Sequence, residues 1–180
     1  MSSTSILVAG FGGQGILFAG KQLALAGMYL DKKVTWMPSY GPESRGGTSN
    51  CTVIISDEGI GSPIIANPDI LIVMNLPSYI KFQGAVTKGG KMFCDSSLVS
   101  EKSDRGDIEK YYIPATAIAY KHNIPKLANV IMLGHVLAVT NIFTADELVM
   151  SMEKSIPPSK KDLLAANINA LNLGFDYVEY

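Results

Sequence analysis

Residues 5–16 read Ser-Ile-Leu-Val-Ala-Gly-Phe-Gly-Gly-Gln-Gly-Ile, an apolar run that passes directly into a glycine-rich turn. The continuous apolar run over Ser5 to Ala9 predicts a strand buried on both faces, as at the centre of an α/β sheet. Good helix formers follow from Ile16 to Met28, and their small residues suit close packing on a sheet. The order strand, glycine turn and helix therefore predicts an α/β protein.

The rest of the chain continues this alternation before it becomes mainly helical. Asp57-Glu58-Gly59 indicates a turn that closes a hairpin, so we expect one antiparallel excursion in the sheet. We expect residues 1–180 to form a single three-layer α/β/α domain with a mixed, mainly parallel sheet. Further strands are predicted over 33–37, 48–56, 69–75, 91–95 and 110–114, and further helices from Pro77 and over 115–122, 128–140, 145–153 and 160–174.

The charges are balanced, with 15 lysines and arginines against 16 aspartates and glutamates, and they form no basic cluster. Neither nucleic acid nor an anionic membrane surface is therefore an expected partner. No segment has the roughly eighteen uninterrupted apolar residues of a membrane span, and no secretory leader is visible, so we expect a cytoplasmic protein. The charged fraction is only 17%, which indicates either a neutral polar exterior or a surface partly covered by other subunits, because interface cores are depleted in charge.

Cysteine and histidine are too scarce for a metal or redox centre. Cys51 and Cys94 are the only cysteines and lie far apart in predicted strands, so they offer neither a CxxC site nor the ligands of an iron–sulfur cluster. His122 and His135 are the only histidines, and their spacing to other ligand types does not resemble a zinc site. We therefore expect no metal on this chain.

The first glycine-rich turn has the spacing of a dinucleotide fingerprint and gives the chain a Rossmann-like start. An NAD or FAD site also needs an acid at the end of the second strand, whereas that strand runs into residues 37–40, Met-Pro-Ser-Tyr. The missing acid argues against a dinucleotide, but the helix N-terminus still favours a phosphate or carboxylate. The candidate ligand-binding residues here are Gly10, Gly12, Gly13, Gln14 and Gly15.

A second glycine-rich loop follows the second strand, and its candidate ligand-binding residues are Ser39, Tyr40, Gly41, Pro42, Glu43, Arg45, Gly46 and Gly47. The Arg45 guanidinium lies between glycines and can receive a carboxylate or phosphate in a bidentate manner, or it can simply pair with Glu43 on the surface. Trp36 and Met37, just upstream, indicate core or interface packing rather than ligand contact. No catalytic residue is identifiable, because the chain has no nucleophile elbow, no Walker lysine and no usefully paired carboxylates.

Both loops together, residues 10–16 and 39–51, resemble the gamma subunit of 2-oxoacid:ferredoxin oxidoreductases, which is equivalent to the gamma domain of pyruvate:ferredoxin oxidoreductase. The likeness covers nearly the whole chain and includes the strand start at residues 68–71. The second loop resembles pyruvate, branched-chain and 2-oxoglutarate members more than indolepyruvate members. A short separate gamma chain favours the 2-oxoglutarate type.

The resemblance implies a subunit of a hetero-oligomeric enzyme that converts a 2-oxoacid and coenzyme A to acyl-CoA and carbon dioxide, and that is inactive by itself. Thiamine diphosphate, magnesium and iron–sulfur clusters are then expected on alpha, beta and ferredoxin-like delta partner subunits, with ferredoxin or another acceptor taking the electrons. The two loops are expected to contact coenzyme A or to form part of the active-site wall. Two alternatives remain: a free-standing nucleotide-binding protein and a non-catalytic scaffold subunit.

Overall fold

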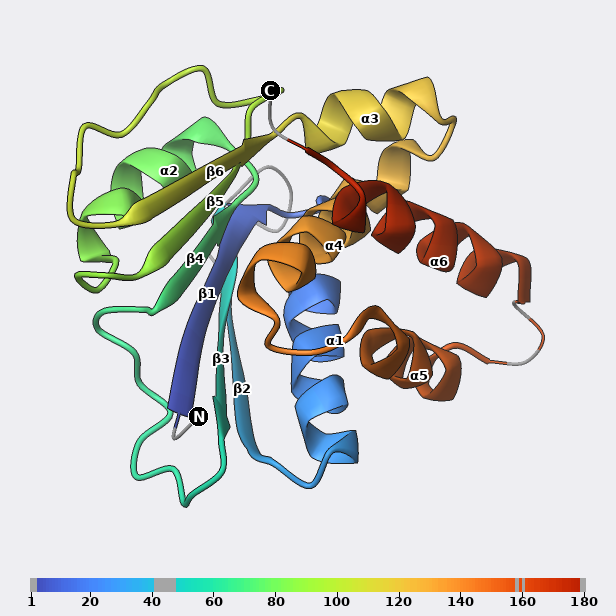
Figure 1. Ribbon diagram of the computed structural model, residues 1–180, viewed down its shortest axis with the longest axis horizontal. Coiled ribbons are helices and arrows are strands. Elements are labelled where there is room, and N and C mark those ends of the chain that lie inside the picture. The colour runs from blue at the N-terminus through green and yellow to red at the C-terminus, as the bar shows by residue number, and fades with distance from the viewer. Residues whose placement is uncertain (1–2, 41–47, 158, 160, 179–180) are drawn as a thin grey trace.

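Six strands form one sheet at the centre of the molecule (Figure 1). The computed structural model describes residues 3–40, 48–157, 159 and 161–178. Across the sheet the order is β2-β3-β1-β4-β5-β6; β1, β4, β5 and β6 run parallel, and β3 is antiparallel to both β1 and β2. The expected mixed, mainly parallel sheet is confirmed. The strands are β1 Ser3–Phe11, β2 Lys33–Tyr40, β3 Thr48–Ser56, β4 Ile70–Val73, β5 Lys91–Asp95 and β6 Glu109–Ile113.

Helices cover both faces of the sheet, as expected for an α/β/α protein. On one side lies α2, and on the other lie α1, α4, α5 and α6, while α3 lies beyond the ends of β5 and β6 (Figure 1). The helices are α1 Ile16–Tyr29, α2 Leu76–Phe82, α3 Ala115–Lys121, α4 Ala128–Thr140, α5 Ala145–Ser155 and α6 Lys161–Phe175, with short 3-10 turns η1 Gln83–Ala85 and η2 Pro125–Leu127. Among the described residues no helix combines the length and the apolar character that crossing a membrane requires.

The position of β1 inside the sheet explains why its residues 6–9 are all apolar and do not alternate with polar residues. Ile6 and Val8 belong to the larger core, which packs against α1 and α4, whereas Leu7 and Ala9 belong to the smaller core beneath α2. Because successive side chains of a strand point to opposite faces, a strand covered on both faces must be apolar throughout. The prediction of a doubly buried first strand is therefore confirmed.

The predicted hairpin turn at Asp57-Glu58-Gly59 is wrong, although the antiparallel excursion is confirmed. These residues lead out of β3 into an irregular segment that ends at β4. By that point both edges of β3 are already paired, one with β2 and the other with β1. The next strand must therefore pass β3 and pair with the free edge of β1, as β4 does.

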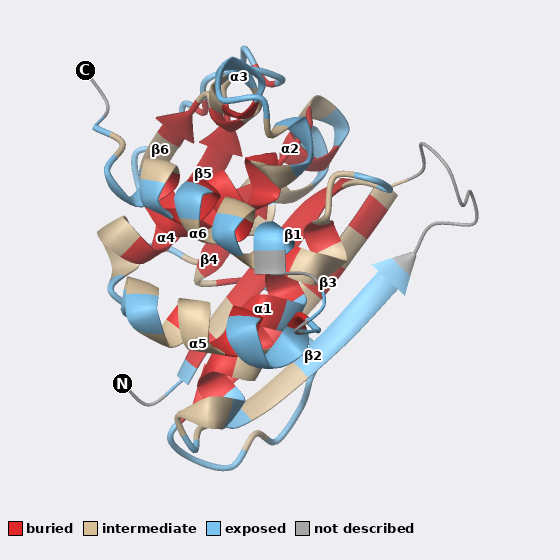
Figure 2. Cartoon of the chain, turned by 90° about the vertical axis from the view of Figure 1, so that its right-hand side faces the viewer, coloured by how far each residue is buried: buried red, intermediate tan, exposed pale blue. Residues whose placement is uncertain are grey.

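The edge strand β2 is largely exposed (Figure 2). Trp36 and Met37 are 37% and 40% exposed, so the core packing considered for them from the sequence is not what the structure shows. Their alternative role, packing at a subunit interface, remains a prediction. Within the described residues the outer edge of β2 pairs with no further strand, and such an edge is the part of a sheet most open to a partner.

Because two thiols are buried, we expect the fold to lose stability at alkaline pH. Both Cys51 and Cys94 are fully buried, and burial raises the pKa of Cys51 to about 11 and that of Cys94 to about 12. Unfolded thiols release their protons near pH 8.5, so above this pH the folded state binds more protons and stability falls as pH rises toward 12. Each thiol contributes a slope of at most about 1.4 kcal/mol per pH unit.

We expect the urea midpoint to be lower at pH 10.5 than at pH 8 and the decrease to be smaller in Cys94→Ala. A midpoint that stays constant over this interval would show that the thiols titrate alike in the folded and unfolded chains.

Candidate functional site

Both glycine-rich loops adjoin the same end of the strands, where β1 and β2 finish and β3 begins. We call this end of the sheet the glycine-loop edge. Phe11, at the end of β1, pairs with Thr48, and Tyr40, at the end of β2, pairs with Ser49. The second loop leaves the sheet at Tyr40 and returns at Thr48. The first loop begins beside this return point, because Phe11 pairs with Thr48. Ser39 is exposed near the end of β2. The predicted site residues Gly41, Pro42, Glu43, Arg45, Gly46 and Gly47, with Ser44 between them, lie outside the described residues.

Glycines shape the first loop, as the sequence indicates. Gly13 and Gly15 have φ values of 97° and 74°, in the left-handed region that favours glycine. Gly12 and Gly13 are exposed to solvent. A Cβ at Gly10 would lie 2.6 Å from Ile16 Cδ1, so glycine allows the first turn of α1 to pack closely on the end of β1.

The N-terminus of α1 lies open for an anion. Gly15 is its N-cap, has no side chain to cap the helix, and is followed by a first turn without an acidic residue. The N–H groups of that turn have no partner within the helix, and the helix dipole adds partial positive charge there. The arrangement can bind a phosphate or carboxylate.

Gln14 serves the loop itself. Its Oε1 accepts a hydrogen bond of 2.7 Å from the Phe11 N–H and one of 3.3 Å from Asn75 Nδ2, and its Nε2 donates to the Met74 carbonyl at 2.7 Å. Both ends of the amide are therefore engaged within the protein. Gln14 was predicted as a ligand-binding residue, and these contacts show a structural task at the same position.

Asn129, in the first turn of α4, was missed in the sequence. It is 4% exposed, and its Nδ2 donates to the Gly15 carbonyl at 3.0 Å, so α4 holds the N-cap of α1 in place. Its only signal in the sequence is that of a polar residue within the otherwise apolar run 128–134. Nothing in the spacing connects it to Gly15, which is 114 residues away.

Three hollows surround the first loop. One of about 270 Å³ is lined by Gly13, Gln14 and Met74 with η2, and one of about 280 Å³ extends from Gly12 to Phe18 and Ser49. The third, of about 250 Å³, lies between the starts of α1 and α4 and the helix α6. Among the described residues that line these three hollows, Lys126 is the one charged side chain, and it lines the first and the third, so this edge favours an anionic ligand.

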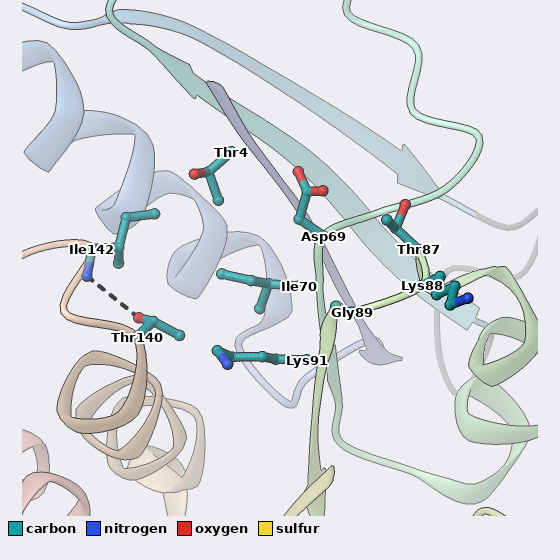
Figure 3. A pocket seen from close by; sticks show the side chains of 10 residues that line it. Thr4, Asp69, Ile70, Thr87, Lys88, Gly89, Lys91, Thr140 and Ile142 are labelled. Carbon is teal, nitrogen blue, oxygen red and sulfur yellow. Dashed lines mark hydrogen bonds between the residues drawn. The ribbon is translucent and has the colours of Figure 1, made fainter. Parts of the chain in front are cut away.

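Another hollow, of about 230 Å³, lies at the opposite edge, where β1, β4 and β5 begin (Figure 3). Its acid, Asp69, accepts hydrogen bonds from the Ser5 N–H and hydroxyl, and Lys91 pairs with Glu109. The charged groups are thus mostly committed to the fold. In open α/β sheets ligands bind at the carboxyl ends of the strands, which favours the glycine-loop edge instead.

The sheet order gives an independent reason against a dinucleotide. In a Rossmann site the second strand lies next to the first, and its terminal acid reaches the ribose of the nucleotide. Here β3 lies between β1 and β2, and its first residues, Thr48 and Ser49, pair with Phe11 and Gly10. The end of β2 is one strand further away, and no acid lies within residues 33–40.

Asp95 is the fully buried carboxylate at the carboxyl end of β5, and it positions α3 beside the first hollow. It accepts hydrogen bonds from the Ser97 N–H at 3.0 Å, the Thr116 N–H at 3.2 Å and the Thr116 hydroxyl at 2.5 Å. With these donors it acts as a cap for α3.

Within the described part of the chain no group of three or more His, Cys, Asp or Glu side chains is placed to hold a metal ion.

Comparison with known proteins identifies the chain. The family described as pyruvate ferredoxin/flavodoxin oxidoreductase matches residues 5–177, so the chain belongs to this family. Within it, the chain is a gamma subunit of the 2-oxoacid:ferredoxin type, as the two loops indicated. The gamma subunit of a keto/oxoacid ferredoxin oxidoreductase from Geobacter sulfurreducens is 26% identical with a TM-score of 0.84, over 98% of this chain and 96% of that one.

Two relatives carry different substrate names. The 2-oxoglutarate synthase subunit KorC of Methanocaldococcus jannaschii is 39% identical, over 89% of this chain and 88% of that subunit. The ketoisovalerate oxidoreductase subunit VorA of Methanothermobacter thermautotrophicus is 37% identical, but the chain spans only 36% of its length. A 2-oxoglutarate:ferredoxin oxidoreductase from Magnetococcus marinus, 21% identical, shares the fold with a TM-score of 0.88 over all of this chain and 32% of that one.

Proposed function

We propose that this chain supplies part of the coenzyme A and active-site region of a complex that oxidatively decarboxylates a 2-oxoacid to an acyl-CoA. The observation that carries the proposal is the glycine-loop edge, where the open N-terminus of α1, Lys126 and the ends of both glycine-rich loops come together. Coenzyme A and 2-oxoacids are both anionic, and the described linings of this edge hold no acid that would repel them. The Magnetococcus marinus structure is described with 2-oxoglutarate, coenzyme A and succinyl-CoA bound.

For the substrate we infer 2-oxoglutarate. The KorC subunits of four organisms match this chain with 31–39% identity over 86–95% of their own length, whereas the match to VorA covers 36% of that protein. The chain is 39% identical to the KorC subunit and 37% identical to VorA, so sequence identity alone favours neither substrate clearly. Ketoisovalerate is therefore the alternative that an assay must test directly.

In this proposal the first loop receives a phosphate or a neighbouring subunit through backbone N–H groups, and Arg45 binds an anionic group of coenzyme A or substrate. Thiamine diphosphate, magnesium and the iron–sulfur clusters belong to alpha, beta and delta partners. The two cysteines here are buried in separate strands with raised pKa values, which does not fit a cluster-ligating set. A cytoplasmic location also remains a prediction.

The test is to tag this chain at its native locus, purify it without oxygen and measure the reduction of a viologen dye. We expect a recovered complex that contains iron and thiamine and reduces the dye only when both coenzyme A and one 2-oxoacid are present. Pyruvate, 2-oxoglutarate and ketoisovalerate are compared side by side. A lone, inactive chain would favour the free-standing nucleotide-binding protein, and an active complex indifferent to changes at both loops would favour a scaffold.

Replacing Lys126 with alanine should raise the KM for coenzyme A while leaving the assembly of the complex unchanged. Lys126 lines two hollows at the open N-terminus of α1, and an exposed ion pair is worth about 1 kcal/mol, so we expect an increase of about three- to tenfold. Lys121→Ala, at the exposed end of α3, is the matched control and should leave this KM unchanged. If Lys126→Ala keeps the same KM for coenzyme A as Lys121→Ala and wild type, Lys126 does not contribute to binding.

A further inference from the structure

Gln14 lies just beyond the point where the parallel pairing of β1 with β4 ends. Parallel pairing of β1 with β4 ends with the Met74 N–H donating to the Ala9 carbonyl at 2.9 Å. Beyond this bond the chains separate, because α1 leaves toward one face of the sheet and α2 toward the other (Figure 1). The place where neighbouring strands send their helices to opposite faces is the point where open α/β sheets bind ligands.

The amide of Gln14 bridges this gap. Its Oε1 accepts from the Phe11 N–H and its Nε2 donates to the Met74 carbonyl, both at 2.7 Å, so the side chain acts as one further peptide unit between the two strands. Each contact requires the same orientation of the amide, since only oxygen can accept from Phe11 and only nitrogen can donate to Met74.

The bridge extends to α2 through Asn75. Asn75 Nδ2 donates to Gln14 Oε1, while Asn75 Oδ1 accepts from the Ser78 N–H at 2.8 Å and caps α2. Asn75 is 2% exposed, so little room is left for it to adopt another arrangement. The shape of the glycine loop, the end of β4 and the start of α2 therefore depend on the same two amides.

We propose that Gln14 is a positioning residue: its amide sets the separation of the ends of β1 and β4, and through it the direction in which the first loop presents its backbone N–H groups. It acts on ligand through the loop, not by touching ligand. The anion that the loop receives is the one named under the proposed function, so this part of the inference rests on that proposal. The role in the loop itself needs no ligand.

Gln14→Glu tests this role, because the change can be reversed by pH. A carboxylate still accepts from Phe11 but cannot donate to Met74, whereas the protonated acid can do both. Two measurements on the assembled complex follow the change: hydrogen–deuterium exchange of residues 10–16 and 70–76 without ligand, and the KM for coenzyme A. Each is compared with the wild-type complex at the same pH.

We expect exchange in both segments to be faster than in wild type at pH 8 and the KM to rise about tenfold, as for one lost hydrogen bond whose carbonyl partner is left without its donor. The Met74 carbonyl oxygen favours the protonated form of the introduced carboxyl and raises its pKa above the usual value of about 4.3, so near pH 5.5 both measurements should move back toward the wild-type values. Gln14→Leu should show the same defect at both pH values, because it has no proton to regain. Gln22→Glu is the matched control: Gln22, on α1, is likewise a hydrogen-bonded amide, but its partners are Ser151 and Ser155 on α5.

Wild-type exchange in ligand-free Gln14→Glu at pH 8, with a raised KM, would overturn the inference and make Gln14 a direct ligand contact. A defect that persists once the introduced carboxyl is protonated would also overturn it, since a donor to Met74 would then not matter. If the wild-type complex shows no coenzyme A-dependent activity, the proposed function fails, and the exchange data still decide the role of Gln14 in the loop.

Discussion

Gly174→Ala is expected to lower the free energy of unfolding by about 3 kcal/mol or more. A Cβ at Gly174 on α6 would lie 1.7 Å from the Ile131 carbonyl oxygen on α4, and one at Gly134 on α4 would lie 2.0 Å from the Leu171 carbonyl oxygen on α6. The two helices touch through their backbones at this pair of glycines. Alanine must push the helices apart and disrupt a core that includes Ile131 and Leu171, which outweighs the roughly 1 kcal/mol that alanine gains over glycine in a helix.

The measurement is urea unfolding of this variant beside wild type. Gly84→Ala is the matched control, since a Cβ there has no atom within 4 Å and the change should leave stability within about 0.5 kcal/mol. Gly134→Ala should behave like Gly174→Ala because it enters the same contact from the other helix. A wild-type midpoint for either variant would mean that the helices can separate at little cost.

Gly15→Ala is the second large effect, and we expect a loss of about 2–3 kcal/mol together with weaker binding of an anion at the start of α1. Two penalties combine at this position. The φ of 74° costs an alanine about 1–2 kcal/mol, and its Cβ would lie 2.4 Å from Asn129 Nδ2. The clash also displaces the amide that holds the N-cap of α1.

The two penalties can be separated by experiment. Gly13 has a φ of 97°, and a Cβ at this position would have no atom within 4 Å. Gly13→Ala should therefore show the conformational cost alone. Adding Asn129→Ala to Gly15→Ala should relieve the clash, and the double variant should then be more stable than the sum of the single changes indicates. Strict additivity would show that Asn129 does not press on position 15. Unfolding midpoints of the four variants decide this.

Local sequence patterns determined the class of fold and predicted the place of the candidate site. The unbroken apolar run at β1, the glycines after it and the small residues of α1 predicted a doubly covered strand and a helix packed closely on it, because these signals act between near neighbours in the chain. The second loop predicted a recognition element, and the described strand ends place its attachment beside the first. Both loops together also indicated the family to which the chain belongs.

Other features were decided only by the tertiary structure. The insertion of β3 between β1 and β2 depends on strand pairing, so Asp57-Glu58-Gly59 was misread as a hairpin turn from local signals alone. The tasks of Gln14 and Asn129 come from partners 60 and 114 residues away, and the contact of Gly134 with α6 comes from the crossing of two helices. An amide or a glycine looks the same in the sequence whether it binds a ligand, bridges two strands or lets two backbones meet, because the choice depends on what the fold brings next to it.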